Sequence, residues 1–229
     1  MSEEKFPEGM LEEIQRFFRD DSSRPAGWDL YPEVFETGYF FPLQRKQELR
    51  TMLQAARKVR PRTLLDIGSD KGGGLYHWCK GLPTLRKVIS IEIKGTPYAE
   101  EFEKAFPQIQ FFWIPGSSYE IGNYPKVVKF LEGDALDVLF LDGDKTAFQR
   151  DFDFYRPLLR PGSIAFLHDI QDPIPGEAFR VLKNRGYRTQ QILETEEWKE
   201  VERNGIRNSY DQWLYHWQGR SCGVGIIYL

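Results

Sequence analysis

The sequence predicts an α/β fold, a doubly wound and mostly parallel sheet with helices on both faces, and two observations support it. From residue 63 onward, short runs rich in β-branched and aromatic residues alternate with stretches of helical periodicity. The runs are almost continuously apolar, as expected of strands that are covered on both faces. Strands and helices in strict succession with short connections favour right-handed crossovers within one sheet.

Seven runs are the candidate strands, in chain order. They are TLLDI (63–67), KVISIEI (87–93), IQFFWI (109–114), DVLFLD (137–142), SIAFLHD (163–169), YRTQQIL (187–193) and CGVGIIYL (222–229). Ligands of doubly wound sheets bind beyond the carboxyl ends of the strands. The residues that end the first, second, fourth and fifth runs are therefore the first candidates for a site.

Apolar residues at helical spacing predict three of the helices. Their stripes are Leu49, Met52, Leu53 and Ala56 in a helix over 45–59; Phe148, Phe152, Tyr155 and Leu159 in a helix ending near the RPG turn at 160–162; and Leu11, Ile14, Phe17 and Phe18 near the start. We interpret residues 1–44 as an N-terminal helical and aromatic extension and residues 45–229 as one domain.

Composition excludes several classes of protein. Of the 229 residues, 41% are hydrophobic and 15% aromatic, which excludes a disordered chain, and no apolar run is long enough to span a bilayer. The net charge of −3 provides no field for nucleic acid or an anionic membrane. Cys79 and Cys222 form no CxxC motif, so neither a disulfide framework nor a zinc site is expected. The acidic start, MSEEKFPEG, lacks the order of a signal peptide, which favours the cytoplasm.

A glycine-rich turn follows the first run in LLDIGSDKGGG, where four glycines surround Asp70. Glycines at a strand-to-helix turn let the backbone approach a ligand and present free N–H groups to it. Glu92, at the end of the second run, is placed to accept hydrogen bonds from a ribose diol. Asp70 replaces the middle glycine of a dinucleotide fingerprint and would repel a pyrophosphate but not a cation. An ordinary loop and helix start is the alternative.

These motifs resemble those of class I S-adenosylmethionine-dependent methyltransferases. DIGSDKGG is similar to their first motif, Glu92 to their ribose-binding acid, and PGSSYE (115–120) to the loop that flanks the adenine. The resemblance covers residues 39–229 and implies a Rossmann-like methyltransferase domain whose seven-stranded sheet has an antiparallel last strand. The implied S-adenosylmethionine-binding residues are Asp66, Gly68, Ser69, Asp70, Gly72, Gly73, Glu92, Ser117, Ser118 and Asp142.

Acids, a lysine and an imidazole gather at the ends of the fourth and fifth runs. Asp142 ends the fourth run, Lys145 follows three residues later, and His168 and Asp169 end the fifth. Such groups converging on one sheet edge suit a hard cation. Adjacent strand residues face opposite ways, so either the strand ends by 168 or only one of the pair faces the ion, with Asp169 preferred.

The D-x-x-K pattern followed by a polar pair resembles the catechol-type, metal-dependent O-methyltransferases. The resemblance implies that Asp142, His168 and Asp169 hold a divalent ion, Mg²⁺ or Mn²⁺, and that Lys145 is the general base, with Asp142 as its catalytic partner. His168 departs from that family, which carries an acid there. The predicted activity is methyl transfer to a hydroxyl of a small molecule, without nucleic acid or membrane partners; a homodimer is compatible with the resemblance.

Other interpretations stay open at this point. Asp142 and Asp169 could cap helices, and Lys145 could be a solvated lysine. The fold could serve a non-catalytic binding protein, or an N- or C-methyltransferase that needs no metal. The aromatic segments 18–44 and 196–220 could form an acceptor pocket, a lid, internal packing or a dimer surface.

Overall fold

The structure, a computed structural model, describes residues 44, 46–193, 203 and 223–229. The helix expected around 11–18 lies outside these residues, as do the aromatic segments 18–44 and 196–220 apart from Gln44 and Arg203. Within the described residues, no helix has both the length and the apolar character needed to cross a membrane.

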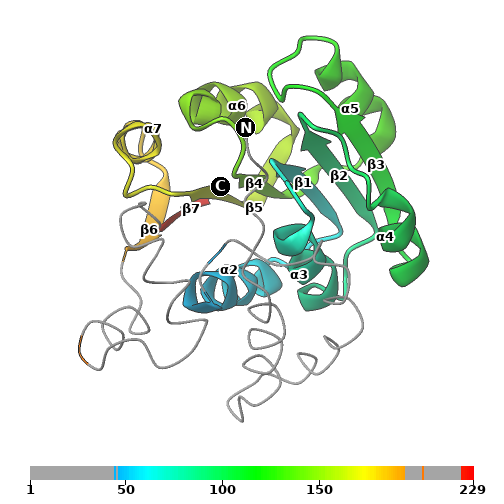
Figure 1. Cartoon of the computed structure of the whole chain (residues 1–229). Helices are drawn as coiled ribbons and strands as arrows, with labels where there is room; N and C mark the ends of the chain where they lie inside the picture. The colour runs from blue at the N-terminus through cyan, green and yellow to red at the C-terminus, as the bar shows by residue number, and fades with distance from the viewer. Residues whose placement is uncertain (1–43, 45, 194–202, 204–222) are drawn as a thin grey trace, which may run out of the picture.

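Seven strands form one sheet in the order β3-β2-β1-β4-β5-β7-β6, which crosses the centre of Figure 1. Strand β7 runs antiparallel to β5 and β6, whereas the other neighbouring pairs are parallel. The predicted sheet, with its antiparallel last strand, is confirmed. Its strands are β1 Thr63–Ile67, β2 Lys87–Glu92, β3 Gln110–Pro115, β4 Leu136–Leu141, β5 Leu159–His168, β6 Arg188–Ile192 and β7 Val224–Tyr228.

Helices cover both faces of the sheet, with α2 and α3 on one side and α5, α6 and α7 on the other (Figure 1). Alternate strand residues pack into the two layers: Leu64 joins the α2–α3 side and Leu65 the opposite side. The helices are α2 Lys46–Lys58, α3 Gly73–Gly81, α4 Ala99–Ala105, α5 Asn123–Leu131, α6 Phe148–Tyr155 and α7 Pro173–Asn184, with short 3₁₀ turns η2 Lys145–Ala147 and η3 Arg156–Leu158.

One predicted helix is shorter than its apolar stripe suggested. Helix α6 ends at Tyr155, and the 3₁₀ turn η3 contains Pro157 in its first positions. Proline has no N–H to continue the α-helical hydrogen bonds, so the helix stops there. Leu159 consequently begins β5, where it pairs with Leu136 instead of extending the stripe, and the RPG sequence lies inside that strand.

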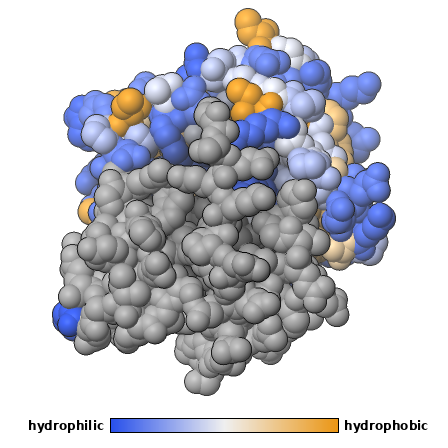
Figure 2. Space-filling model, in the orientation of Figure 1, coloured by the Kyte–Doolittle hydropathy of each residue, from blue (hydrophilic) through white to orange (hydrophobic). Residues whose placement is uncertain are grey.

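The described surface on the side shown in Figure 2 is mostly hydrophilic, with separate hydrophobic spots. Isolated apolar residues of this kind are usual on protein surfaces. The large exposed hydrophobic residues are Ile93, Tyr119, Ile121, Val128, Ile174 and Leu193.

Candidate active site

The carboxyl ends of β1 and β4 meet at the point where the strand order reverses. Successive strands lie on one side of β1 up to β3, and the chain then returns to place β4 on the other side. The backbone N–H of Asp142 donates to the carbonyl of Ile67 at 2.9 Å, so the two strand ends are held together. In doubly wound sheets this switch point is where ligands bind.

Gly68 is required here by the protein's own backbone. Its φ is +87°, and a Cβ atom at this position would lie 2.5 Å from the backbone nitrogen of Gly143. Any side chain would therefore push β1 and β4 apart at their ends. The glycine allows the close approach of the two loops whether or not a ligand is present.

A small cavity of about 30 Å³ lies at this edge, beside the glycine turn. That is room for one or two water molecules. The predicted cofactor-binding residues that line it are Asp66, Gly68, Ser69, Asp70, Gly73 and Asp142. Gly72, Glu92, Ser117 and Ser118 are not among its lining residues.

Asp66 is a buried acid that accepts no hydrogen bond from the described residues. Its side chain is 1% exposed, and neither carboxylate oxygen has a hydrogen-bond partner among the described residues. Burial raises its pKa well above the ordinary value, and the charges of Asp142 and Glu92 raise it further. Buried acceptors are nearly always satisfied, so this side chain calls for a donor group on a ligand or a water molecule.

Glu92 holds the glycine turn in place. Its two carboxylate oxygens accept hydrogen bonds from the backbone N–H groups of Asp70, at 2.8 Å, and Lys94, at 3.1 Å. Asp70 has a left-handed backbone with φ of 43°, which this hydrogen bond supports. The acid thus lies against the turn, and its contact with a ribose stays a prediction.

The predicted serines have internal partners. The hydroxyl of Ser69 lies in a buried chain, 2.8 Å from both Tyr98 and Ser90. Ser118 donates to Asp151 at 2.8 Å, and burial is the main cause that raises the pKa of Asp151 to about 6. The carbonyl of Ser117 accepts from the side chain of Asn123. Both loop serines therefore stabilise the segment that follows β3.

The four residues predicted to carry the chemistry come together beside the cavity. The ammonium of Lys145 lies 2.6 Å from Asp142 Oδ1 and 2.7 Å from Asp169 Oδ2. His168 Nδ1 lies 3.1 Å from Asp142 Oδ1 and 3.2 Å from Asp169 Oδ1. Ligand atoms of the two acids and the histidine lie within 4.8 Å of one another, and two carboxylates with an imidazole form a suitable donor set for a divalent cation.

A left-handed residue brings His168 and Asp169 to the same side. Strand β5 ends at His168, and Asp169 has φ of 57°. The alternation of a strand no longer applies at that point, so adjacent side chains both reach the cluster. A non-glycine residue in this backbone region is uncommon and is often found at functional sites.

The charges in the cluster stabilise one another. Burial alone would raise the pKa values of Asp142 and Asp169, but His168 and Lys145 outweigh it and lower both. Burial would lower the pKa of Lys145, yet the two carboxylates raise it. For His168 too, burial is outweighed, chiefly by the charge of Asp142, and the pKa is raised. Lys145 is therefore protonated in this state and must lose a proton before it acts as a base.

Two residues of this site, Gln44 and Glu48, were missed by the sequence analysis. Gln44 Nε2 donates to Asp142 Oδ2 at 2.7 Å, and Glu48 Oε2 lies 3.7 Å from His168 Nε2. The sequence contained a signal for them, because Gln44, Glu48, Met52 and Ala56 follow one another at intervals of four residues. Polar residues in the apolar row of a helix indicate a buried polar contact.

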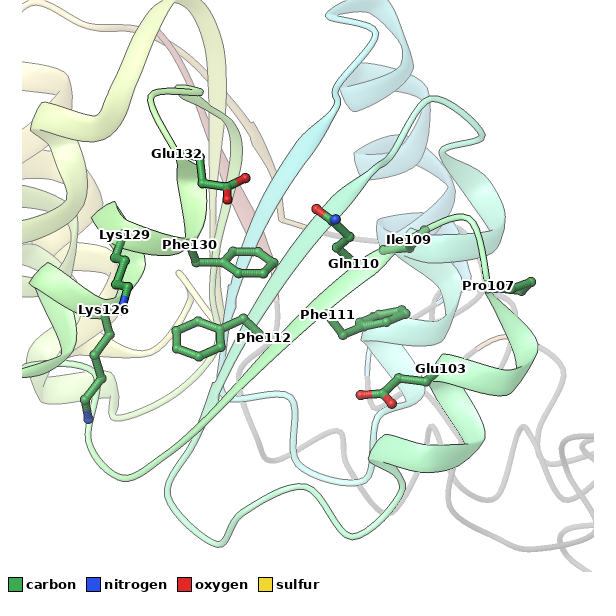
Figure 3. Close-up of a pocket in the computed structure, with 10 residues that line it drawn as sticks. All are labelled: Glu103, Pro107, Ile109, Gln110, Phe111, Phe112, Lys126, Lys129, Phe130 and Glu132. Carbon is green, nitrogen blue, oxygen red and sulfur yellow. The ribbon is translucent and has the colours of Figure 1, made fainter.

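A second and larger cavity lies away from these residues. It is an open groove of about 900 Å³ along the free edge of β3, between α4 and α5 (Figure 3). Figure 3 shows Phe111 and Phe112 pointing to opposite sides of the strand. The groove contains none of the predicted site residues.

Comparison with known protein families finds a match that includes the switch-point residues. Residues 65–170 match a family described as a methyltransferase domain. This segment of the chain is similar to methyltransferase domains. The match begins in β1 and ends just after Asp169, so it includes the glycine turn, Asp142 and Lys145. The predicted resemblance to methyltransferases is confirmed for this segment, whereas no curated protein sequence matches significantly.

Solved structures share the fold of this chain. An O-methyltransferase from Bacillus cereus in complex with SAH is 12% identical, with 94% of this chain and 97% of that chain covered and a TM-score of 0.59. For cofactor-bound Rv0187 from MTB the identity is 17%, the coverage 84% of each chain and the TM-score 0.56. The O-methyltransferase TomG from Streptomyces achromogenes, in complex with SAM, is 15% identical over 80% of each chain, with a TM-score of 0.55. At these identities the likeness shows the fold alone.

Proposed function

We propose that this methyltransferase transfers a methyl group from S-adenosylmethionine to a hydroxyl oxygen of a small molecule, assisted by a divalent cation. The observation that carries the proposal is the contact of the Lys145 ammonium with both Asp142 and Asp169, next to the glycine turn. A proton acceptor, a pair of acids and a cofactor-type turn thus share one sheet edge. The SAM- and SAH-bound structures with the same fold support the choice of cofactor.

Asp66 supports a cofactor that carries an ammonium group. Asp66 lines the cavity with Gly68 and Asp142, and neither of its carboxylate oxygens has a hydrogen-bond partner among the described residues. A nucleoside cofactor needs far more room than 30 Å³, so side chains must move when it binds. Gln44 is the main candidate, because it donates to Asp142 and its Oε1 would lie 3.0 Å from a Cβ built on Gly74.

Lys145 is the proposed proton acceptor. When bound, S-adenosylmethionine supplies an activated methyl group on a sulfonium. Neutral Lys145 takes the proton of the acceptor hydroxyl at Nζ, while Asp142 and Asp169 hold the amine and then stabilise the ammonium that results. The side chain of Lys145 is 31% exposed, so it can reach an acceptor that enters from solvent.

Asp142, His168 and Asp169 are the proposed ligands of the cation. When bound there, a divalent cation lowers the pKa of nearby hydroxyl and ammonium groups. The three side chains converge without any change of backbone, since β5 already ends at His168. Lys145 would exchange its contact with one carboxylate for the acceptor hydroxyl.

Calorimetric titration with S-adenosylhomocysteine tests the cofactor. Wild-type protein should bind it, and Asp66→Asn should bind at least about tenfold more weakly, because a neutral amide cannot pair with an ammonium. Asp153→Asn, an exposed acid on α6 paired with Arg185, is the matched control and should bind normally. Failure of the wild type to bind would end the proposal.

Methyl transfer without a metal is the second candidate. The specific observation in its favour is that Lys145 and His168 already neutralise much of the charge of Asp142 and Asp169. Transfer of labelled methyl to a panel of phenols and alcohols, with and without chelator, separates the two. Turnover that survives chelation selects the metal-free route.

A further inference from the structure

The imidazole of His168 is held between acids on both of its nitrogens. Nδ1 faces Asp142 and Asp169, whereas Nε2 faces Glu48 of α2 at 3.7 Å, an ion-pair distance. Within the described residues, Nε2 has no hydrogen-bond partner, so this ion-pair contact is the interaction that it makes there. The side chain of Glu48 is completely buried. The buried carboxylate of Glu48 thus lies on the Nε2 side of the His168 ring, opposite the side that faces the proposed cation.

Glu48 is itself fixed from the opposite end of the chain. Its Oε1 accepts a hydrogen bond from the backbone N–H of Gly223, at 2.7 Å. Gly223 directly precedes β7, which pairs with β5 so that Val224 lies opposite His168. The carboxylate therefore has one oxygen bound to the sheet and the other turned toward the imidazole, an arrangement that leaves it little freedom.

We propose that Glu48 is a positioning residue that keeps the proton of His168 on Nε2, so that Nδ1 serves as the third ligand of a cation site that prefers Mn²⁺ over Mg²⁺. This inference rests on the proposed cation site. A neutral imidazole has one donor and one acceptor nitrogen, and a carboxylate accepts only. Without a cation, Nδ1 lies within hydrogen-bond distance of Asp142 and Asp169 and donates to them. A cation bound between these acids takes the place of that proton, and Glu48 then keeps the remaining proton on Nε2.

The imidazole also determines which cation fits. Mg²⁺ favours oxygen ligands, whereas imidazole nitrogen suits transition metals. Replacing an oxygen ligand by nitrogen weakens the binding of Mg²⁺ more than that of Mn²⁺, because Mn²⁺ is a transition-metal ion. We expect wild-type protein to bind Mn²⁺ at least about tenfold more tightly than Mg²⁺, and His168→Asp to narrow that ratio.

Glu48→Gln is the variant that tests the positioning role. Its amide oxygen can keep the hydrogen bond from Gly223, and its volume matches that of glutamate. Its NH₂ group then faces His168 Nε2 and donates, which moves the imidazole proton to Nδ1. The substitution thus replaces an acceptor opposite Nε2 by a donor and leaves the packing in place.

Two measurements follow on the full chain: calorimetry with Mn²⁺ and Mg²⁺, and ¹⁵N NMR of the histidine rings with Zn²⁺ as a diamagnetic probe. Wild-type protein should show a protonated Nε2 and a metal-bound Nδ1 on His168. Glu48→Gln should lose about 10–100-fold in Mn²⁺ affinity. His77, a buried histidine held by the carbonyl of Gly73, should keep its signals, and Glu177→Gln on α7 is the surface control.

The outcomes separate the inference from the proposed function. Unchanged Mn²⁺ affinity in a folded Glu48→Gln, or a zinc-bound Nε2 in the wild type, overturns the inference and leaves the methyltransferase proposal intact. If Glu48→Gln fails to fold, the wild-type NMR spectrum and the Mn²⁺ to Mg²⁺ ratio still decide. A wild type that binds no cation overturns both the cation site and the inference. If the protein binds a cation but does not bind S-adenosylhomocysteine, only the proposal about the cofactor is overturned.

Discussion

The small cavity at the switch point, called the crevice below, and the groove along β3 differ both in size and in the chemistry of their residues. The crevice measures about 30 Å³, and the groove about 900 Å³. Yet Asp66, which has no hydrogen-bond partner among the described residues, lines the crevice, and the Asp142–Lys145 ion pair lies beside it. The groove is lined by three phenylalanines together with charged side chains, which are Glu103, Lys126, Lys129 and Glu132 (Figure 3). Volume alone would select the groove, which contains none of the predicted site residues.

The difference has a structural cause. The crevice lies where two loops leave adjacent parallel strands, so polar groups at strand ends are forced together and partly buried. The groove lies along β3, which within the described residues has a neighbouring strand on one side only. Two of its phenylalanines stack on other rings, Phe111 on Trp113 and Phe112 on Phe130. Buried charge, more than cavity volume, therefore indicates the proposed active site at the crevice.

The largest expected effect is that of removing the proton acceptor. Lys145→Gln should lower turnover by about 10²–10⁴-fold, the usual contribution of general base catalysis, while S-adenosylhomocysteine affinity stays within a few-fold. Radiolabelled methyl transfer and calorimetry measure the two quantities.

Lys145→Arg is the matched control for that variant. It keeps a cation between Asp142 and Asp169, but guanidinium does not lose its proton. If Lys145 is the base, arginine is as damaging as glutamine. Near-normal turnover in the arginine variant would instead make the lysine an electrostatic clamp.

A second prediction uses the buried acid Asp151, which accepts from Ser118 in the loop after β3. Burial is the main cause that raises its pKa to about 6, so the folded protein holds this proton more tightly than the unfolded chain. That contribution to stability is present below about pH 4 and is lost as pH rises through 6. Asp151→Asn should therefore gain about 1–3 kcal/mol relative to wild type between pH 4 and pH 7.

Urea unfolding at the two pH values measures this change. Asparagine can still accept from Ser118, so the comparison isolates the ionisation of the carboxyl group. Asp153→Asn, two residues along α6 and exposed, should show no such gain. A difference between Asp151→Asn and wild type that is independent of pH would mean that the carboxyl is adequately solvated in the fold.

The sequence predicted more of the crevice than of its surroundings. Asp142, Lys145, His168 and Asp169 follow apolar runs, and parallel strands must bring such ends to one edge, so their meeting was predictable. The left-handed backbone of Asp169 was not, because it depends on how β5 ends against β7. The contacts of Gln44 and Glu48 join residues far apart in the chain, and only the packed position of α2 fixes them.

The third prediction concerns the small volume of the crevice. If the hydrogen bond from Gln44 to Asp142 must break before a nucleoside enters, the competent state is only partly populated, and apparent affinity falls by that fraction. Gln44→Ala should then bind S-adenosylhomocysteine up to about tenfold more tightly, since a hydrogen bond to a charged group contributes about 1.5–3 kcal/mol, of which part is regained in water. Gln44→Glu, which repels Asp142, should act in the same direction. Weaker binding by both variants would instead make Gln44 a direct ligand of the cofactor.

The smallest effect is expected in the groove. Phe112 and Phe130 are stacked with ring centroids 5.1 Å apart and are both partly exposed, so Phe112→Ala should destabilise the fold by about 1–2 kcal/mol. In a double-mutant cycle with Phe130→Ala, the coupling free energy should be about 0.5–1.5 kcal/mol. Methyl transfer and S-adenosylhomocysteine affinity, corrected for the folded fraction, should stay within twofold of wild type, because no groove residue lines the crevice. A marked rise in KM for an acceptor molecule in Phe112→Ala would show that the groove takes part in substrate binding, and the contrast between the two regions would no longer hold.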